Sequence, residues 1–167
     1  MNDALRRARA MLRDVTPLRS DCGLCCGHRC CASAEAEATG MLLFPGEAAY
    51  YTGRPGYALR EAKQGMLLMC EGSCNREDRP LSCRIFPLLP VVREDGVKVA
   101  VDFRARSVCP LARQGRSAMS NEFIHAVRES GRILCEDEVQ RSFLLMLTHA
   151  QDEWKALRRQ FGGERHV

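Results

Sequence analysis

The chain has 167 residues, of which 46% are hydrophobic, enough to enclose a core, and we expect a single domain over 1–167. A formal net charge of +4 and an aromatic content of 6% argue against nucleic acid as a partner, because both the basic field and the supply of stacking rings are weak. The polar N-terminus lacks the apolar core of a signal peptide, and no apolar run has the length of a bilayer span. We therefore expect no membrane partner and a cytoplasmic location, where thiols stay reduced unless they bind metal or act in catalysis.

The first predicted element is an amphipathic helix over residues 3–15, which ends at Thr16-Pro17. Its apolar residues recur at helical spacing, with arginines on the opposite face: Ala4, Leu5, Ala8, Met11, Leu12 and Val15. Residues 19–40 show no apolar periodicity, and we interpret them as an irregular loop.

Short elements are predicted in the middle of the chain. Residues 41–44 are a candidate for a buried strand, and a helical turn is expected from Pro45 through Tyr51, since proline is favoured early in a helix. Residues 57–63 and 66–70 are expected to pair as two strands across Gln64-Gly65.

A β-hairpin is the clearest local prediction. Two runs rich in β-branched residues, 88–93 and 97–103, flank Glu94-Asp95-Gly96, and Asp-Gly between such runs is typical of a tight hairpin turn. Ser120 is expected to cap a helix that runs to about Leu134. A second helix follows, with one apolar face formed by Phe143, Leu147, Ala150, Trp154, Leu157 and Phe161.

These elements predict an α+β fold with a small irregular cysteine-rich, metal-binding centre and a β-hairpin, braced by N- and C-terminal helices. The cysteine-rich region spans 19–110, and the helical C-terminal part spans 120–161.

The ten cysteines are clustered rather than scattered. Cys22-x2-Cys25 has the spacing of a metal-binding knuckle, in which the chain turns and its amides face the sulfurs. Cys70-x3-Cys74, Cys83 and Cys109 supply further thiolates. The predicted metal ligands are Cys22, Cys25, Cys26, Cys30, Cys70, Cys74, Cys83 and Cys109. Side chains of adjacent cysteines diverge, so the pairs at 25–26 and 30–31 are either split between two sites or include one packing member.

Expectations also follow for four residues other than the predicted ligands. Arg79 and Arg84 flank Cys83 and are expected to offset the negative charge that several thiolates place on one metal. His28 lies among the cysteines and is either a further ligand or a solvated loop residue. Cys135 stands apart, at the end of a predicted helix, and is expected to pack in the core.

The metal is either an iron–sulfur cluster or zinc, since both accept four thiolates. Adjacent cysteines and the Cys109-Pro110 dipeptide accommodate a cluster of several irons more readily than a single zinc, which favours iron–sulfur.

The same residues resemble a known family. Cys22-Gly-Leu-Cys25-Cys26 and Arg79-Pro-Leu-Ser-Cys83-Arg-Ile-Phe-Pro87 look like the motifs of the YkgJ-type cysteine-cluster proteins, also described as a zinc- or iron-chelating domain and found in flagellin lysine N-methylases. The resemblance covers roughly residues 19–110 and departs from the family at Arg19, where its first cysteine would fall. It implies metal or iron–sulfur binding.

We therefore expect a cytoplasmic protein that binds a metal ion or cluster, with a protein partner as a further expectation. Two alternatives stay open. By its resemblance to the methylase-associated proteins, the chain is an accessory or catalytic part of a protein-modifying, methyl-transfer-like enzyme, although no cofactor-binding loop is visible. Otherwise it is a zinc-stabilised interaction module, in which the apolar stripe of the last helix faces a partner.

Overall fold

The computed structural model describes residues 1–20, 22–30, 40–70 and 75–161. The longer helices are α1 (Asp3–Met11), α5 (Asn121–Leu134) and α6 (Glu138–Phe161), and the shorter ones are η1 (Cys22–Cys25), α2 (Ala48–Tyr51), η2 (Arg76–Asp78), α3 (Leu81–Ile85), η3 (Phe103–Ser107), α4 (Pro110–Gln114) and η4 (Arg116–Ala118). The strands are β1 (Met41–Leu42), β2 (Tyr57–Ala62), β3 (Gly65–Cys70), β4 (Leu88–Arg93) and β5 (Gly96–Val101). Helices alternate with two small antiparallel sheets, so the predicted α+β class is confirmed.

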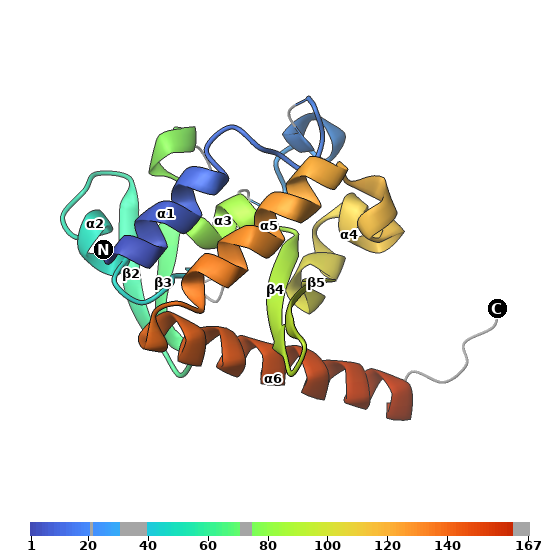
Figure 1. The fold of residues 1–167 in the computed structure, drawn as a ribbon. Coiled ribbons are helices and arrows are strands. Elements are labelled where there is room, and N and C mark those ends of the chain that lie inside the picture. The colour runs from blue at the N-terminus through green and yellow to red at the C-terminus, as the bar shows by residue number, and fades with distance from the viewer. Residues whose placement is uncertain (21, 31–39, 71–74, 162–167) are drawn as a thin grey trace.

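The β4–β5 hairpin lies between the two long C-terminal helices (Figure 1). Leu88 is opposite Val101 and Arg93 is opposite Gly96, so the turn consists of two residues and Gly96 takes the positive φ of 110°. Helix α5 covers the hairpin closely, because Gly131 faces it and a Cβ at that position would lie 2.6 Å from the Cβ of Pro90. Helix α1 packs on the other side of α5.

The second sheet has the order β1-β3-β2 and lies beside α2 and α3. The two predicted strands pair, but the turn is shifted by one residue: Tyr57 lies opposite Cys70 and Ala62 lies opposite Gly65, so the turn is Lys63-Gln64 rather than Gln64-Gly65. Leu43, Tyr51 and Leu68 form a small core under this sheet, separate from the main core of the helices and the hairpin.

Several predicted boundaries shift. Helix α1 ends at Met11, and Met11 itself is 38% exposed, because a helix that packs against one long neighbour buries only a narrow stripe. The strand predicted over 41–44 spans only Met41 and Leu42, although the amide of Leu43 still donates to the carbonyl of Met66 in β3. The chain leaves the sheet at Phe44, whose amide donates to the Glu47 carboxylate instead. The strand predicted over 97–103 ends at Val101, where Asp102 caps η3 through the amide of Arg104.

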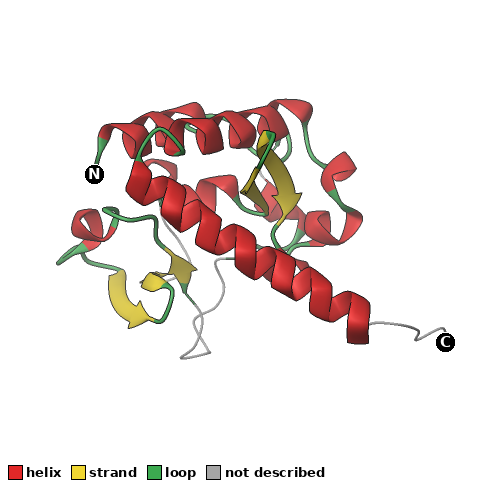
Figure 2. Cartoon of the chain, turned by 60° about the horizontal axis from the view of Figure 1, so that its bottom comes forward, coloured by secondary structure: helices red, strands yellow, loops and turns green. Residues whose placement is uncertain are grey.

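The predicted helix from Ser120 is confirmed: α5 runs to Leu134, and the Ser120 hydroxyl accepts from the amide of Phe123. Helix α6 is buried along its first half, but Leu157 is 54% exposed and Phe161 is 76% exposed. Both views show the last turns of α6 reaching past the hairpin (Figures 1 and 2). In the part of the chain that the structure describes, no helix combines the length and the apolar character needed to cross a membrane.

Candidate metal centre

The first cysteine group lies on a compact turn. Cys22 and Cys25 begin and end η1, and the amides of Cys26 and His28 both donate to the carbonyl of Gly23, each over 3.1 Å. The imidazole of His28 covers the α-carbon of Gly23 so closely that a Cβ there would lie 2.1 Å from the ring. His28 reaches this place because it adopts a left-handed backbone with φ 56°. The turn therefore needs glycine at position 23.

The thiols of this group differ in exposure. Cys22 is half-buried and packs against the main core, and Cys26 is also half-buried, with its sulfur 4.0 Å from the carbonyl oxygen of Cys22. Cys25 and Cys30 are exposed. Cys31, the fifth member of the group in the sequence, lies outside the described residues.

The second group is divided between a strand and a helix. Cys70 is the last residue of β3 and is half-buried. Cys83 lies in the middle of α3 and is also half-buried. The predicted ligand Cys74, which precedes η2, falls outside the described residues.

Helix α3 is held at its start by a buried carboxylate. Glu47 is fully buried, and its side chain accepts from the amide of Leu81 over 2.8 Å and from that of Phe44 over 3.1 Å. The Arg9 guanidinium donates to the same carboxylate over 2.7 Å. Burial raises the pKa of Glu47, while the hydrogen bond from Leu81 and the charge of Arg9 act in the opposite direction. Glu47 thus fixes the first turn of the helix that carries Cys83.

The segment before α3 is held by the side chain of Arg84. Its guanidinium donates four hydrogen bonds, to the carbonyl oxygens of Arg79 (3.0 Å), Arg9 (3.2 Å), Arg76 (3.2 Å) and Glu77 (2.8 Å). The predicted role of Arg84 beside a metal centre stays a prediction; the contacts that the structure gives it are to the backbone around η2.

Arg76 completes the attachment of this segment to α1. Its guanidinium donates to the carbonyls of Leu12, Arg13 and Val15, which follow the end of α1 and have no partner within the helix. Arg9, Arg76 and Arg84 are called the arginine cluster below. Burial, together with the charges of Arg9 and Arg76, lowers the pKa of Arg84.

Two tyrosines of α2 donate hydrogen bonds to the segment around η2. The Tyr51 hydroxyl donates to the carbonyl of Asp78 over 2.6 Å, and the Tyr50 hydroxyl donates to the Asp78 carboxylate over 2.6 Å. Burial raises the pKa of Tyr51. A hydrogen bond from Tyr50 and another from Arg54 lower the pKa of Asp78.

Two further cysteines lie in apolar surroundings. Cys109 is 9% exposed, belongs to the main core, and donates its amide to the carbonyl of Ala105 over 2.8 Å just before α4. Cys135 follows the end of α5 and packs against the same core, as expected, and burial raises the pKa of its thiol. The position of Cys109 is therefore typical of a cysteine that packs in a core, and its role as a metal ligand stays a prediction.

The donor types fit the expected metal, since thiolates are the ligands that zinc and iron–sulfur clusters prefer. None of the eight described cysteines is in a disulfide. Among the residues that the structure describes, no three cysteine, histidine, aspartate or glutamate side chains are grouped closely enough to hold one ion. How the thiols are shared between sites stays a prediction.

No sequence pattern indicated a role for Arg9 or Glu47, which are separated by 38 residues and meet only in the folded chain. Asp102, which was not among the predicted site residues, forms an ion pair of 2.6 Å with Arg104. Aspartate is favoured directly before the first turn of a helix, where it caps the helix. This preference is the sequence signal that could have identified Asp102.

No family model, curated protein or solved structure matches the chain. The resemblance to the YkgJ-type cysteine-cluster proteins therefore stays a prediction based on the quoted motifs.

Proposed function

We propose that the chain is a metal-binding protein that holds an iron–sulfur cluster or zinc through clustered cysteine thiolates. The proposed ligands are drawn from Cys22, Cys25, Cys26, Cys30, Cys70, Cys74, Cys83 and Cys109. An iron–sulfur cluster remains the favoured cofactor, for the reasons drawn from the adjacent cysteines.

The exposure of the cysteines is the observation that supports this proposal best. A cysteine that serves only for packing behaves as a small apolar residue and is among the most buried residue types. Of the eight described cysteines, only Cys109 is buried, while Cys25 and Cys30 are exposed. Packing therefore does not account for the two exposed cysteines of the first group, whereas binding to a metal removes the reactivity of an exposed thiolate.

The anchoring of Cys83 supports the proposal independently. A ligand that stays in place without the metal lowers the entropy lost on binding, and α3 is fixed by Glu47 at its start and by Arg84 before it. The charge of Arg9 is paired with Glu47, but the guanidiniums of Arg76 and Arg84 also place positive charge beside this helix. Four thiolates on a divalent ion carry about two net negative charges, which these guanidiniums would offset.

Anaerobic purification with metal supplied during expression tests the proposal. We expect either iron with acid-labile sulfide and a visible absorption band, or stoichiometric zinc without colour. A colourless protein that contains neither metal would refute it.

Two matched variants test the ligand assignment. Cys83→Ser should lose metal and loosen the fold, whereas Cys135→Ser should keep the metal, because Cys135 is packed against the core at the end of α5. Metal content by mass spectrometry and thermal unfolding would be compared for both. Equal metal content in the two variants contradicts the role given to Cys83.

A further inference from the structure

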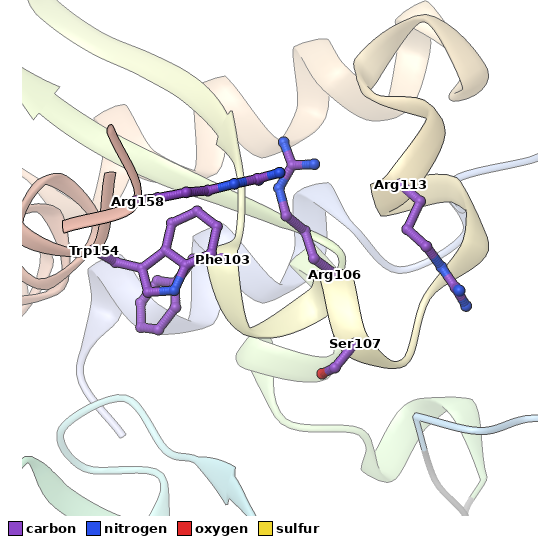
Figure 3. Close-up of a pocket in the computed structure, with 6 residues that line it drawn as sticks. All are labelled: Phe103, Arg106, Ser107, Arg113, Trp154 and Arg158. Atoms are coloured by element: carbon purple, nitrogen blue, oxygen red, sulfur yellow. The ribbon is translucent and has the colours of Figure 1, made fainter. Parts of the chain in front are cut away.

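A basic hollow lies between η3, α4 and the projecting end of α6. It has a volume of about 540 Å³ and is lined by Phe103, Arg106, Ser107, Arg113, Trp154 and Arg158 (Figure 3). The lining contains three guanidinium groups and no carboxylate.

The arginines of this hollow differ from the other arginines on the same elements. Arg104 pairs with Asp102 and Arg93 pairs with Asp152. Within the described part of the chain, the guanidiniums of Arg106, Arg113 and Arg158 have neither a carboxylate partner nor a hydrogen bond, and Arg158 lies over the ring of Trp154 at 5.4 Å. The guanidiniums of Arg106 and Arg158 point toward one another (Figure 3). Two like charges that converge without an anion between them leave room for a negative group from outside the chain.

The projecting end of α6 adds an apolar surface beside these charges. Trp154, Leu157 and Phe161 follow one another at the spacing of one helix face, and Leu157 and Phe161 are 54% and 76% exposed. A helix face of this kind is normally covered. The hollow and the apolar face together combine positive charge with exposed hydrophobic side chains.

We propose that this surface, formed by Arg106, Arg113 and Arg158 with Leu157 and Phe161, docks an acidic amphipathic segment of a partner protein. Carboxylates of the segment would enter between the guanidiniums of Arg106 and Arg158, with Arg113 at the side, and its apolar side chains would cover the end of α6. This inference does not depend on the metal proposed above.

The structure favours a protein segment over two other anions. A small-molecule site buries most of its ligand, but Ser107, Arg113 and Arg158 are exposed. Non-specific binding of single strands uses uncovered aromatic faces for stacking, and the Trp154 ring already has Phe103 stacked at 5.5 Å and Arg158 over it.

Trp154 is the only tryptophan of the chain, so its fluorescence reports on this surface directly. The full-length protein would be titrated with a labelled synthetic amphipathic peptide bearing Glu on its polar face and Leu on its apolar face, and with the same peptide bearing Gln for Glu. We expect the Glu peptide to bind, to shift the Trp154 emission and to weaken with added salt. The Gln peptide should bind at least roughly tenfold more weakly, because one hydrogen bond to a charged group contributes a factor of about ten to the affinity.

Variants assign the binding to the surface. Arg106→Glu and Leu157→Ser should each reduce the affinity for the Glu peptide severalfold, while Arg141→Glu, an exposed arginine in the first half of the same helix, should not. Equal affinity for the Glu and Gln peptides, or equal affinity of all three variants, overturns the proposal. The proposal is also overturned if inorganic phosphate shifts the Trp154 emission as much as the Glu peptide does at the same concentration, or if single-stranded DNA binds more tightly than the Glu peptide. Absence of any binding by the Glu peptide overturns it as well.

Discussion

Glu47 accepts three hydrogen bonds in the candidate site. It is fully buried and joins Arg9 of α1 to the first turn of α3 by accepting from two amides and one guanidinium. Glu47→Gln should destabilise the protein by about 3–5 kcal/mol, because the amide leaves the buried Arg9 without its counter-charge. Urea unfolding followed by circular dichroism measures the loss.

Glu136 provides the matched control for this substitution. It pairs with Arg7 over 2.6 Å, but both side chains are about half exposed, at 54% and 49%. Glu136→Gln should therefore leave the midpoint of urea unfolding nearly unchanged. If the two variants unfold at the same urea concentration, Glu47 does not anchor α3.

Among the elements, the hairpin and α6 are joined by polar contacts as well as by packing. The Arg93 guanidinium donates two hydrogen bonds to Asp152, of 2.5 and 2.7 Å, and the amide of Val92 donates to the Thr148 hydroxyl over 3.0 Å. The Gln151 side chain accepts from the amide of Phe103 and donates to the carbonyl of Val101. The end of the hairpin is thereby fixed on the middle of α6.

The pair of Arg93 and Asp152 predicts a pH dependence. Hydrogen bonds from Arg93 lower the pKa of Asp152 below its ordinary value of 3.8, so its contribution is complete above that value and is lost as the pH falls through the folded-state pKa. At neutral pH, Asp152→Asn should cost at most about 1 kcal/mol, since Asp152 is 41% exposed. The difference from the unsubstituted protein should vanish in strong acid.

Glu153 is the control, because it is the exposed neighbour of Asp152 on the same helix. Glu153→Gln should leave the free energy of unfolding unchanged at both pH values, as measured by urea titration. A deficit for Asp152→Asn that persists unchanged in acid would mean that the pair with Arg93 is not its cause.

On the scale of the whole molecule, the cysteine turn and the long helices should depend on metal to different degrees. Residues 22–30 include Cys22, Cys26 and Gly23 as their only members that are not exposed, so they have little apolar surface to order them. Helix α5 instead buries Phe123, Val127 and Leu134 completely. Chelation should abolish amide protection in 22–30 and preserve it in α5 and in the first half of α6.

Hydrogen exchange with and without a chelator measures this difference. Loss of protection along the entire chain would make the metal the centre of the whole fold. Protection in 22–30 that does not change would show that these cysteines are not ligands.

The sequence predicted the elements whose signals are local. The hairpin around Asp95-Gly96, the pairing of 57–63 with 66–70 and the cap at Ser120 all depend on residues close together in the chain. The apolar face of α6 was predicted only in part: Phe143 and Leu147 are buried as expected, but the face also buries Leu144, Gln140 and Gln151. The exposure of the helix beyond Trp154 depends on where the hairpin ends, which no periodicity reveals.

The candidate site was predicted less completely than the fold. Cysteine spacing identified candidate ligands, but the contacts that hold Cys83 are to backbone carbonyls and to Glu47, which lies 36 positions earlier in the chain. Every residue has a backbone carbonyl, so residue types do not indicate which carbonyls accept hydrogen bonds from arginines. The contacts of the arginine cluster could therefore be recognised only in the folded chain.

The arginine cluster also has an evolutionary consequence. Arg76 and Arg84 donate only to main-chain carbonyls, and a carbonyl is the same whichever side chain its residue carries. Exposed positions that supply these acceptors, such as Glu77, can therefore drift without loosening the segment. The donors cannot drift in the same way, because lysine lacks the planar fork with which Arg84 reaches four acceptors at once. Selection should thus bear on Arg76 and Arg84 and leave many of the residues they hold free to change.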